Sequence, residues 1–463
     1  MNTVERFFIP KSVDEALALL AEYGDQAAII AGGSLQALRL PSRVQILIDL
    51  LRCGLEGIES KGDVVHIGAT TTAATLAATD GLSAIGADAL REAGAGVSGQ
   101  AVRNQVTLAG NLVGTMTWAD LSVACLALDA RVLISAHGGK KRTLSLTELF
   151  DGHPKKVLGR DSIITAVELP RARGVGSAFV KQSRTVADLA LVSVAASVRV
   201  DKGVLRDVRI ALGSVQPRPV RAADAERMLE GVAVEDADFA AAGKAATDGL
   251  KITADIRASK EYRREVLAVS VKRALETAVA RASGKAKYSP PRRPVPAPWT
   301  RAPVGEVGGL LKITVDGVPH RAHIKAGENL LDVLRRLGAV SVKRGCSEGY
   351  CGTCAILVEG RLLNACLLLA SQVQGCKITT AVGIGTIFDP HPIQTALVEE
   401  GAVQCGFCTP GWVVATKSLL DQIPDPTDEE ARAAMDGNLC RCTGYVKPLA
   451  ALQNAAATLR KRS

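Results

Sequence analysis

All but two of the chain's 11 cysteines lie within residues 346–442, the exceptions being Cys53 and Cys125. In that region the stretch GNLCRCTG (437–444) places Cys440 and Cys442 on either side of one arginine. Cysteines two residues apart rarely reach the Cα separation and Cβ geometry of a disulfide. The first residues, MNTVERFFIP, carry no secretory signal pattern, so we expect a cytoplasmic chain in which clustered cysteines bind metal.

The first cysteine group has the C-x4-C-x2-C spacing of plant-type [2Fe–2S] proteins, followed by a fourth cysteine further along the chain. A loop around an anionic cluster must turn backbone N–H groups toward it and adopt positive φ at several positions. Gly345, Gly349 and Gly352 supply that conformational freedom. The alternative is a zinc site, although zinc loops favour paired C-x2-C knuckles. The candidate ligands are Cys346, Cys351, Cys354 and Cys366.

The second group has the pattern C-x2-C-x31-C-x-C and lies at predicted helix boundaries. Thr409 and Pro410 are expected to cap and start a helix after the first pair, and the N–H groups of that helix favour nearby thiolates. The second pair follows a helix predicted to begin at a capping box of Thr427 and Glu430. Iron–sulfur and zinc chemistry both fit this spacing taken alone. The candidate ligands are Cys405, Cys408, Cys440 and Cys442, whereas Cys376 fits neither group and is expected to be a buried apolar residue.

The rest of the sequence predicts an α+β protein of several domains. A capping box of Ser12 and Glu15 starts a helix over 13–23, before a buried strand over 27–31. Three strands followed by helices are predicted over 175–284, a hairpin turning at Asp316-Gly317 after that, and helices from about residue 390 onward. Residues 285–309 hold six prolines and few apolar residues, so we expect an extended linker that cannot join a core.

The sequence predicts neither nucleic-acid binding, nor a membrane segment, nor a dinucleotide-binding glycine loop. The formal charge of +9 is dispersed and aromatic residues make up only 3%, so no nucleic-acid partner is predicted. The longest apolar run (189–198) is too short to cross a bilayer and predicts no integral membrane segment. The stretch GAGVSG (94–99) formally matches the dinucleotide-binding glycine pattern, but it follows a predicted helix rather than a strand.

Three stretches carry both cysteine patterns in order: GCSEGYCGTCAILVEGRLLNAC, HPIQTALVEEGAVQCGFCTPG and GNLCRCTGY. They resemble the iron–sulfur subunit of the molybdenum hydroxylases, the family of xanthine dehydrogenase, aldehyde oxidoreductase and CO dehydrogenase. The resemblance implies a β-grasp ferredoxin-like domain over 310–385 with the distal [2Fe–2S] cluster. It implies a four-helix domain over 386–463 with the proximal [2Fe–2S] cluster. It also implies that Gln404 and Cys442 lie against a molybdopterin.

The glycine-rich turns IIAGGS (29–34) and NQVTLAGNLVG (104–114), with SAFVKQSR, DLALVSVA, ALGSVQPRPVRA and DIRASKEYRREVLA, resemble the flavin subunit of the same family. This implies a vanillyl-alcohol-oxidase (PCMH)-type FAD domain over 1–173 and a CO dehydrogenase flavoprotein C-terminal domain over 174–284. The stretch after Gly33 is shorter than is usual in the family, and Ala109 replaces a customary glycine. The implied FAD contacts are Ala31, Gly32, Gly33, Ser34, Leu35, Val97, Thr107, Gly110, Asn111, Gly114, Asp120, Ile164 and Lys181.

The resemblance implies an electron-transfer subunit with no catalytic residue of its own, because 463 residues leave no room for the large molybdopterin-binding subunit. Electrons are expected to run from Mo on that partner through the proximal and distal clusters to FAD. The acceptor would be NAD, a quinone or oxygen, and the assembly a heterodimer or a dimer of heterodimers. One alternative is an aryl-CoA reductase branch running in reverse, whose flavin subunit needs four more cysteines for a [4Fe–4S] cluster. The other is a stand-alone electron carrier without a Mo partner.

Overall fold

The computed structural model describes residues 4–34, 40–114, 116–171, 174–299, 302 and 304–462. They form two compact units that do not follow the order of the chain. The first unit holds residues 1–54, 98–106 and 291–463, and the second holds 55–97 and 107–290. The first unit therefore combines the beginning of the flavin-like sequence with both cysteine groups.

A small sheet in the order β13-β1-β3-β2 opens the first unit. Its elements are β1 (Arg6–Ile9), α1 (Val13–Tyr23), β2 (Ala27–Ile30), β3 (Ile46–Asp49) and β13 (Gly305–Glu306). As predicted, Ser12 caps α1, and its side chain accepts a hydrogen bond from the Glu15 N–H at 3.2 Å. The other half of the predicted capping box is wrong. The Glu15 carboxylate accepts from the Lys11 N–H at 2.8 Å, and so satisfies a backbone donor one residue before the cap.

The proline-rich segment takes part in this sheet, so the prediction that residues 285–309 cannot join a core is wrong at their C-terminal end. β13 pairs antiparallel with β1, and Val307 is only 5% exposed within the hydrophobic core beside that sheet. The Arg6 guanidinium forms an ion pair with Glu306 at 2.7 Å. A proline removes an N–H donor only at its own position, and none lies between residues 304 and 309. That short stretch is therefore free to pair and to bury its valine.

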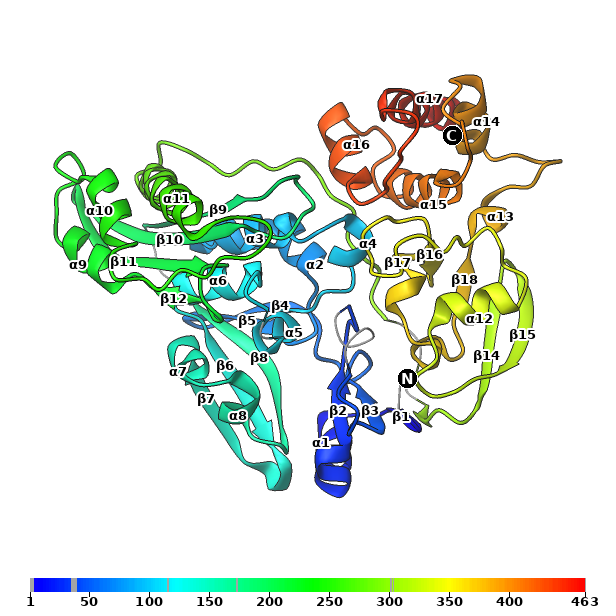
Figure 1. Ribbon diagram of the computed structural model, residues 1–463, viewed down its shortest axis with the longest axis horizontal. Coiled ribbons are helices and arrows are strands. Elements are labelled where there is room, and N and C mark those ends of the chain that lie inside the picture. The colour runs from blue at the N-terminus through cyan, green and yellow to red at the C-terminus, as the bar shows by residue number, and fades with distance from the viewer. Residues whose placement is uncertain are drawn as a thin grey trace. The chain divides into compact units, whose positions relative to one another are not determined.

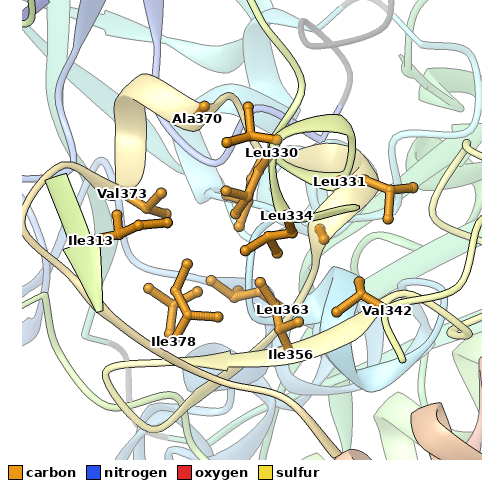
Figure 2. Packing of buried hydrophobic residues seen from close by; sticks show 14 of the residues in the cluster. Ile313, Leu330, Leu331, Leu334, Val342, Ile356, Leu363, Ala370, Val373 and Ile378 are labelled. Atoms are coloured by element: carbon orange, nitrogen blue, oxygen red, sulfur yellow. The ribbon is translucent and has the colours of Figure 1, made fainter. Parts of the chain in front are cut away.

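The ferredoxin-like part is a mixed sheet in the order β15-β14-β18-β16-β17, with α12 packed on it. Its elements are β14 (Leu310–Val315), β15 (Val318–His323), α12 (Leu330–Arg336), β16 (Ala355–Val358), β17 (Arg361–Asn364) and β18 (Lys377–Thr379). The predicted hairpin is confirmed, because Asp316 and Gly317 join β14 to β15 with φ of 49° and 84°. Figure 2 shows Leu330 and Leu334 of α12 in one cluster with Ile356 of the sheet. This arrangement confirms the predicted β-grasp domain.

The C-terminal part is helical, as predicted. Its elements are α13 (Ala381–Ile384), α14 (Pro392–Glu399), α15 (Thr409–Leu420), α16 (Asp428–Met435) and α17 (Val446–Arg462). α16 begins at the predicted capping box, in which Thr427 and Glu430 each bond the other's backbone N–H. The predicted cap of α15 is wrong by one residue, because Cys408 holds the N-cap position and Thr409 is already helical. Trp412 and Leu419 of α15 lie in the core that these helices share.

A short segment from the flavin-like sequence, residues 98–106, belongs to the iron–sulfur unit. It contains α4 (Gln100–Arg103), whose Val102 packs against the ferredoxin-like core and whose Ala101 packs against the helical core. Asn104 donates from Nδ2 to the Leu362 carbonyl at 2.9 Å. This segment therefore ties the two cysteine-binding domains together.

The second unit contains two sheets with helices, which confirms its predicted α+β character. The first sheet has the order β4-β5-β8-β6-β7. The strands and helices of this part are β4 (Ile58–Lys61), β5 (Val64–Gly68), α2 (Ala73–Ala78), α3 (Asp88–Gly96), α5 (Leu108–Val113), α6 (Asp120–Ala127), β6 (Arg131–Ala136), β7 (Lys141–Ser145), α7 (Leu146–Asp151), α8 (Pro154–Leu158) and β8 (Ser162–Pro170). The glycine pattern at 94–99 lies at the end of α3, so it does not follow a strand.

The second sheet, β12-β11-β10-β9, is antiparallel throughout. Its elements are β9 (Val175–Gln182), β10 (Val192–Asp201), β11 (Val204–Gly213), β12 (Val220–Arg221), α9 (Ala223–Leu229), α10 (Phe239–Ala245) and α11 (Lys260–Ala282). The three predicted strands are thus confirmed, and α9, α10 and α11 pack with them around one core (Figure 1). Over the whole described part of the chain, no helix has both the length and the hydropathy needed to cross a membrane.

Candidate iron–sulfur and flavin sites

The first cysteine group lies on the loop between α12 and β16 and directly after β17. Cys346 and Cys351 lie on that loop, Cys354 comes directly before β16, and Cys366 follows β17. The Cys346 sulfur accepts hydrogen bonds from the N–H groups of Glu348, Tyr350 and Cys351 at 3.3–3.4 Å. Backbone donors aimed at a sulfur stabilise its anionic form, as a thiolate ligand requires.

Two of the three predicted glycines have the expected conformation, since Gly349 and Gly352 have φ of 82° and 68°. Gly345 serves a different purpose, because a Cβ there would lie 2.7 Å from both the Cys351 sulfur and the Thr353 hydroxyl. Between Gly345 and Cys354, a further positive φ is at Ser347, with φ of 58°. The loop thus depends on left-handed backbone at Ser347, Gly349 and Gly352, and on the close approach of the Gly345 backbone to the Cys351 sulfur.

The four thiols interact in pairs, Cys346 with Cys351 and Cys366, and Cys354 with Cys366. The interaction with Cys351 lowers the pKa of Cys346, and the same interaction raises the pKa of Cys351. The four cysteines come from one loop and from the residues after β17, and three backbone N–H groups donate to the Cys346 sulfur. Four thiolates presented in this way are the donor set of a [2Fe–2S] core.

The second group brings its cysteines together in two pairs at the ends of α15 and α16. The sulfurs of Cys405 and Cys442 are 3.5 Å apart, and Cys408 shares a hydrogen bond with Cys440. Burial opposes ionisation of Cys440, but the interactions with Thr443, with the Cys442 backbone and with Cys408 together outweigh it and lower the pKa of that thiol to about 7. Burial and the contact with Cys440 raise the pKa of Cys408 to about 12. Cys405 and Cys442 are exposed, so this group has one edge open to solvent.

Two residues that sequence reasoning missed support this second loop. Thr443 donates to the Cys440 sulfur from its N–H at 3.4 Å and from its hydroxyl at 3.1 Å. The Tyr445 hydroxyl accepts from the Cys440 N–H at 3.1 Å. The position of Thr443 directly after the CRC motif was an available signal, because a hydroxyl next to a thiolate is a ready donor.

The two ligand loops touch each other, which the sequence did not predict. The Leu439 N–H, directly before Cys440, donates to the Cys351 carbonyl at 3.0 Å. A Cβ on Gly352 would overlap the Gly437 carbonyl and lie 2.8 Å from the Asn438 amide. One hydrogen bond therefore links the backbone of a ligand in the first group to the backbone beside a ligand in the second.

The implied flavin contacts divide between the two units. Within the first unit, Ala31, Gly32, Gly33 and Ser34 form a turn directly after β2. Gly33 has φ of 70°, and a Cβ on Gly32 would overlap the Gln105 carbonyl oxygen, so both positions require glycine. Leu35 lies outside the described residues, as do residues 36–39 of the shortened stretch.

Within the second unit, Thr107 caps α5, and its hydroxyl accepts from the Gly110 N–H at 3.3 Å. A Cβ at position 110 would lie 2.6 Å from that hydroxyl, so this cap requires the glycine that the chain has there. Ala109, which replaces the customary glycine, donates its N–H to the Ala69 carbonyl at 3.0 Å. Asn111, one residue after Gly110, accepts from the Ser122 N–H at 3.2 Å, and Gly114 ends α5.

The remaining flavin candidates also lie in the second unit. Lys181 on β9 forms a buried ion pair with Asp120 at 3.0 Å and donates to the Gly96 carbonyl at 2.8 Å. Burial raises the pKa of Asp120, and Lys181 opposes that effect. Val97 follows α3 beside Gly96, and Ile164 is buried on β8. The structure thus joins Lys181 directly to Asp120 and places Val97 next to the carbonyl that Lys181 contacts.

A β-grasp domain and a helical domain, each with four cysteines brought together, define the class of iron–sulfur proteins. In this chain they are joined to an α+β half with glycine-rich turns. Four family models match the chain in succession. Residues 2–172 match the FAD binding domain in molybdopterin dehydrogenase, and 177–278 the CO dehydrogenase flavoprotein C-terminal domain. Residues 313–375 match the 2Fe-2S iron-sulfur cluster binding domain, and 380–453 the [2Fe-2S] binding domain.

Individual relatives match the two halves separately. The nicotinate dehydrogenase small FeS subunit of Eubacterium barkeri is 44% identical over 146 residues, 31% of this chain and 93% of that subunit. The xanthine dehydrogenase iron-sulfur-binding subunit of Escherichia coli O157:H7 is 42% identical over 137 residues, 29% of this chain and 86% of that subunit. A chain of carbon monoxide dehydrogenase from Hydrogenophaga pseudoflava matches with a TM-score of 0.57 and 31% identity, covering 61% of this chain and 99% of that one.

The chain belongs to the molybdenum hydroxylase family, as an oxidoreductase subunit with a FAD-binding half fused to two [2Fe–2S]-binding domains. It corresponds to the flavin and iron–sulfur subunits of enzymes such as xanthine, aldehyde and CO dehydrogenases.

Proposed function

We propose that this chain is the electron-transfer subunit of a molybdopterin-dependent hydroxylase or dehydrogenase. When bound, the clusters pass single electrons and FAD stores two, which matches the chain to a two-electron acceptor such as NAD, a quinone or oxygen. Cys346, Cys351, Cys354 and Cys366 would hold the distal cluster, and Cys405, Cys408, Cys440 and Cys442 the proximal one. The observation that carries the proposal is the hydrogen bond from the Leu439 N–H to the Cys351 carbonyl, because it joins the two ligand loops directly.

The open edge of the second cysteine group supports a large molybdopterin-binding chain as the partner. Cys405, Cys442 and Gln404 are exposed there. The apolar side chains that flank them are exposed as well, with Leu439 at 50% and Val446 at 76%. Large apolar groups in water beside a redox centre are typical of a protein interface. A heterodimer or a dimer of heterodimers would cover them.

The flavin half supports FAD without a further cluster. Its only cysteines are Cys53 and Cys125. Cys125 is buried within α6, and two cysteines are too few for a four-cysteine cluster. The aryl-CoA reductase type of flavin half, which requires four cysteines for a [4Fe–4S] cluster, is not supported.

Purification of the full chain with its native partners tests the proposal. The expected result is about four irons and one FAD per chain, together with a large Mo-containing chain. Zinc in place of iron, or only two irons, would refute the second cluster. A chain that carries its clusters and flavin but purifies alone would instead support a stand-alone electron carrier.

A further inference from the structure

Two glutamine side chains bond to the carbonyl groups of the glycine turn that follows β2. Gln372 donates from Nε2 to the Ala31 carbonyl at 3.0 Å. Gln105 donates from Nε2 to the Gly32 carbonyl at 3.4 Å. Gln372 is 1% exposed and Gln105 is 3% exposed, whereas most glutamine side chains in proteins are exposed to solvent. They lie far from the turn in sequence, and neither is in its β-α-β segment.

Gln372 is held in place by all of its hydrogen-bonding groups. Besides the Ala31 carbonyl, its Nε2 donates to the Asp49 carboxylate at 3.3 Å, and its Oε1 accepts from the Leu369 N–H at 3.1 Å. Asp49 is itself buried at the end of β3, where it accepts from the Leu51 N–H at 2.9 Å. A fully bonded buried amide has one orientation, so its donor toward Ala31 is fixed.

A trans peptide is planar, and its C=O and N–H point in opposite directions. The Ala31 carbonyl and the Gly32 N–H belong to one peptide, and the Gly32 carbonyl and the Gly33 N–H belong to the next. Gln372 and Gln105 bind the two carbonyls, so the Gly32 N–H points away from Gln372 and the Gly33 N–H points away from Gln105. Consecutive N–H groups that point outward from a glycine turn are suited to bind a phosphate anion.

We propose that Gln372 and Gln105 are positioning residues for the flavin, which hold the glycine turn so that its N–H groups face the pyrophosphate of FAD. This inference rests on the proposed FAD site at residues 31–34. Gln372 lies in the same segment as the cluster ligand Cys366, and a Cβ on Gly33 would lie 3.3 Å from the Leu367 carbonyl. The iron–sulfur domain is thereby part of the flavin site in this chain, and its folding contributes to flavin affinity.

The test measures the FAD dissociation constant of the full chain after removal and re-addition of flavin, by quenching of flavin fluorescence. Gln372→Met keeps the side-chain length and removes both donors. It is expected to weaken FAD binding about tenfold, and Gln105→Met about threefold because its bond is longer. Iron content and the visible spectrum of the clusters should stay unchanged in both.

Gln374→Met is the matched control. Gln374 lies two residues away and also uses both ends of its amide, with the Lys312 N–H at 2.8 Å and the Leu310 carbonyl at 3.2 Å, but it does not contact the turn. Its FAD affinity should equal that of the parent. Parental affinity in both Gln372→Met and Gln105→Met would overturn the inference, as would equal weakening in the control. If Gln372→Met loses its clusters, Gln105→Met decides the question, and a parent that binds no FAD would refute the proposed flavin site itself.

Discussion

The buried carboxyl of Asp49 predicts a specific dependence of stability on pH. It is 2% exposed, and burial raises its pKa from 3.8 to about 7, against the opposing effects of the Leu51 N–H and Gln372. The folded state therefore binds a proton more tightly than the unfolded state. Stability is greatest below pH 4 as far as this group is concerned, and it falls as the pH rises toward and through 7. Since a tenfold change in proton affinity corresponds to about 1.4 kcal/mol, the loss between pH 5 and 8 is about 2.5 kcal/mol.

Asp49→Asn removes the charge and should remove this loss. The variant is expected to be less stable than the parent by about 1 kcal/mol at pH 5, because its amide meets the Gln372 donor less well, and more stable at pH 8. Urea unfolding of the flavin-free chain at both pH values measures the effect. In a Trp118→Phe background, the tryptophans at 299 and 412 report on the first unit alone.

Asp14→Asn is the control for this experiment, because Asp14 is exposed on α1 in the same part of the unit. It should follow the parent at both pH values. If the difference in unfolding free energy between Asp49→Asn and the parent is the same at pH 5 and pH 8, the carboxyl of Asp49 titrates in its ordinary range and the reasoning is wrong.

Three further predictions follow from the ligand loops and the domain boundaries. Cys440→Ser should chiefly damage the proximal cluster, whereas Cys442→Ser should also weaken the magnetic coupling between Mo and iron. Electron paramagnetic resonance of the assembled complex measures this coupling. Equal loss of coupling in both variants would contradict the separate role of Cys442. Gly352→Ala should lower the free energy of unfolding of the iron–sulfur unit by about 3 kcal/mol or more, because its Cβ would overlap Gly437. Gly360→Ala is the control and should lower it by about 1 kcal/mol, because Gly360 shares the positive φ but has open space around it. Thermal unfolding that ranks the two equally would count against the contact between the loops. Residues 1–309 expressed alone should melt above residues 1–284, because they add β13 and Val307 to the first sheet. Equal melting temperatures would restore the view of 285–309 as a passive tether.

Local signals predicted the features that depend on neighbouring residues. The Asp316-Gly317 hairpin, the capping box of Thr427 and Glu430 and the three strands predicted over 175–284 are all present where the sequence placed them. Each is decided within a few residues, by backbone conformation, by side-chain caps or by alternation of apolar residues. The local pattern did not predict which backbone N–H the Glu15 carboxylate accepts from, or that Cys408 rather than Thr409 is the N-cap of α15. Both depend on the path of the chain that enters the helix.

The cysteine spacings by themselves determined the two candidate cluster sites, because ligand type and separation along a loop limit which metal centre fits. Only the tertiary structure decided how those sites are connected. The bond between Leu439 and Cys351, the strand at Gly305–Glu306 and the contacts of Gln372 with Ala31 all join residues separated by long stretches of chain. Contacts of this kind depend on which surfaces are buried against each other, and a pattern over neighbouring residues does not predict them. The role of a buried glutamine such as Gln372 depends on the carbonyl it binds, and only the fold brings that carbonyl to it.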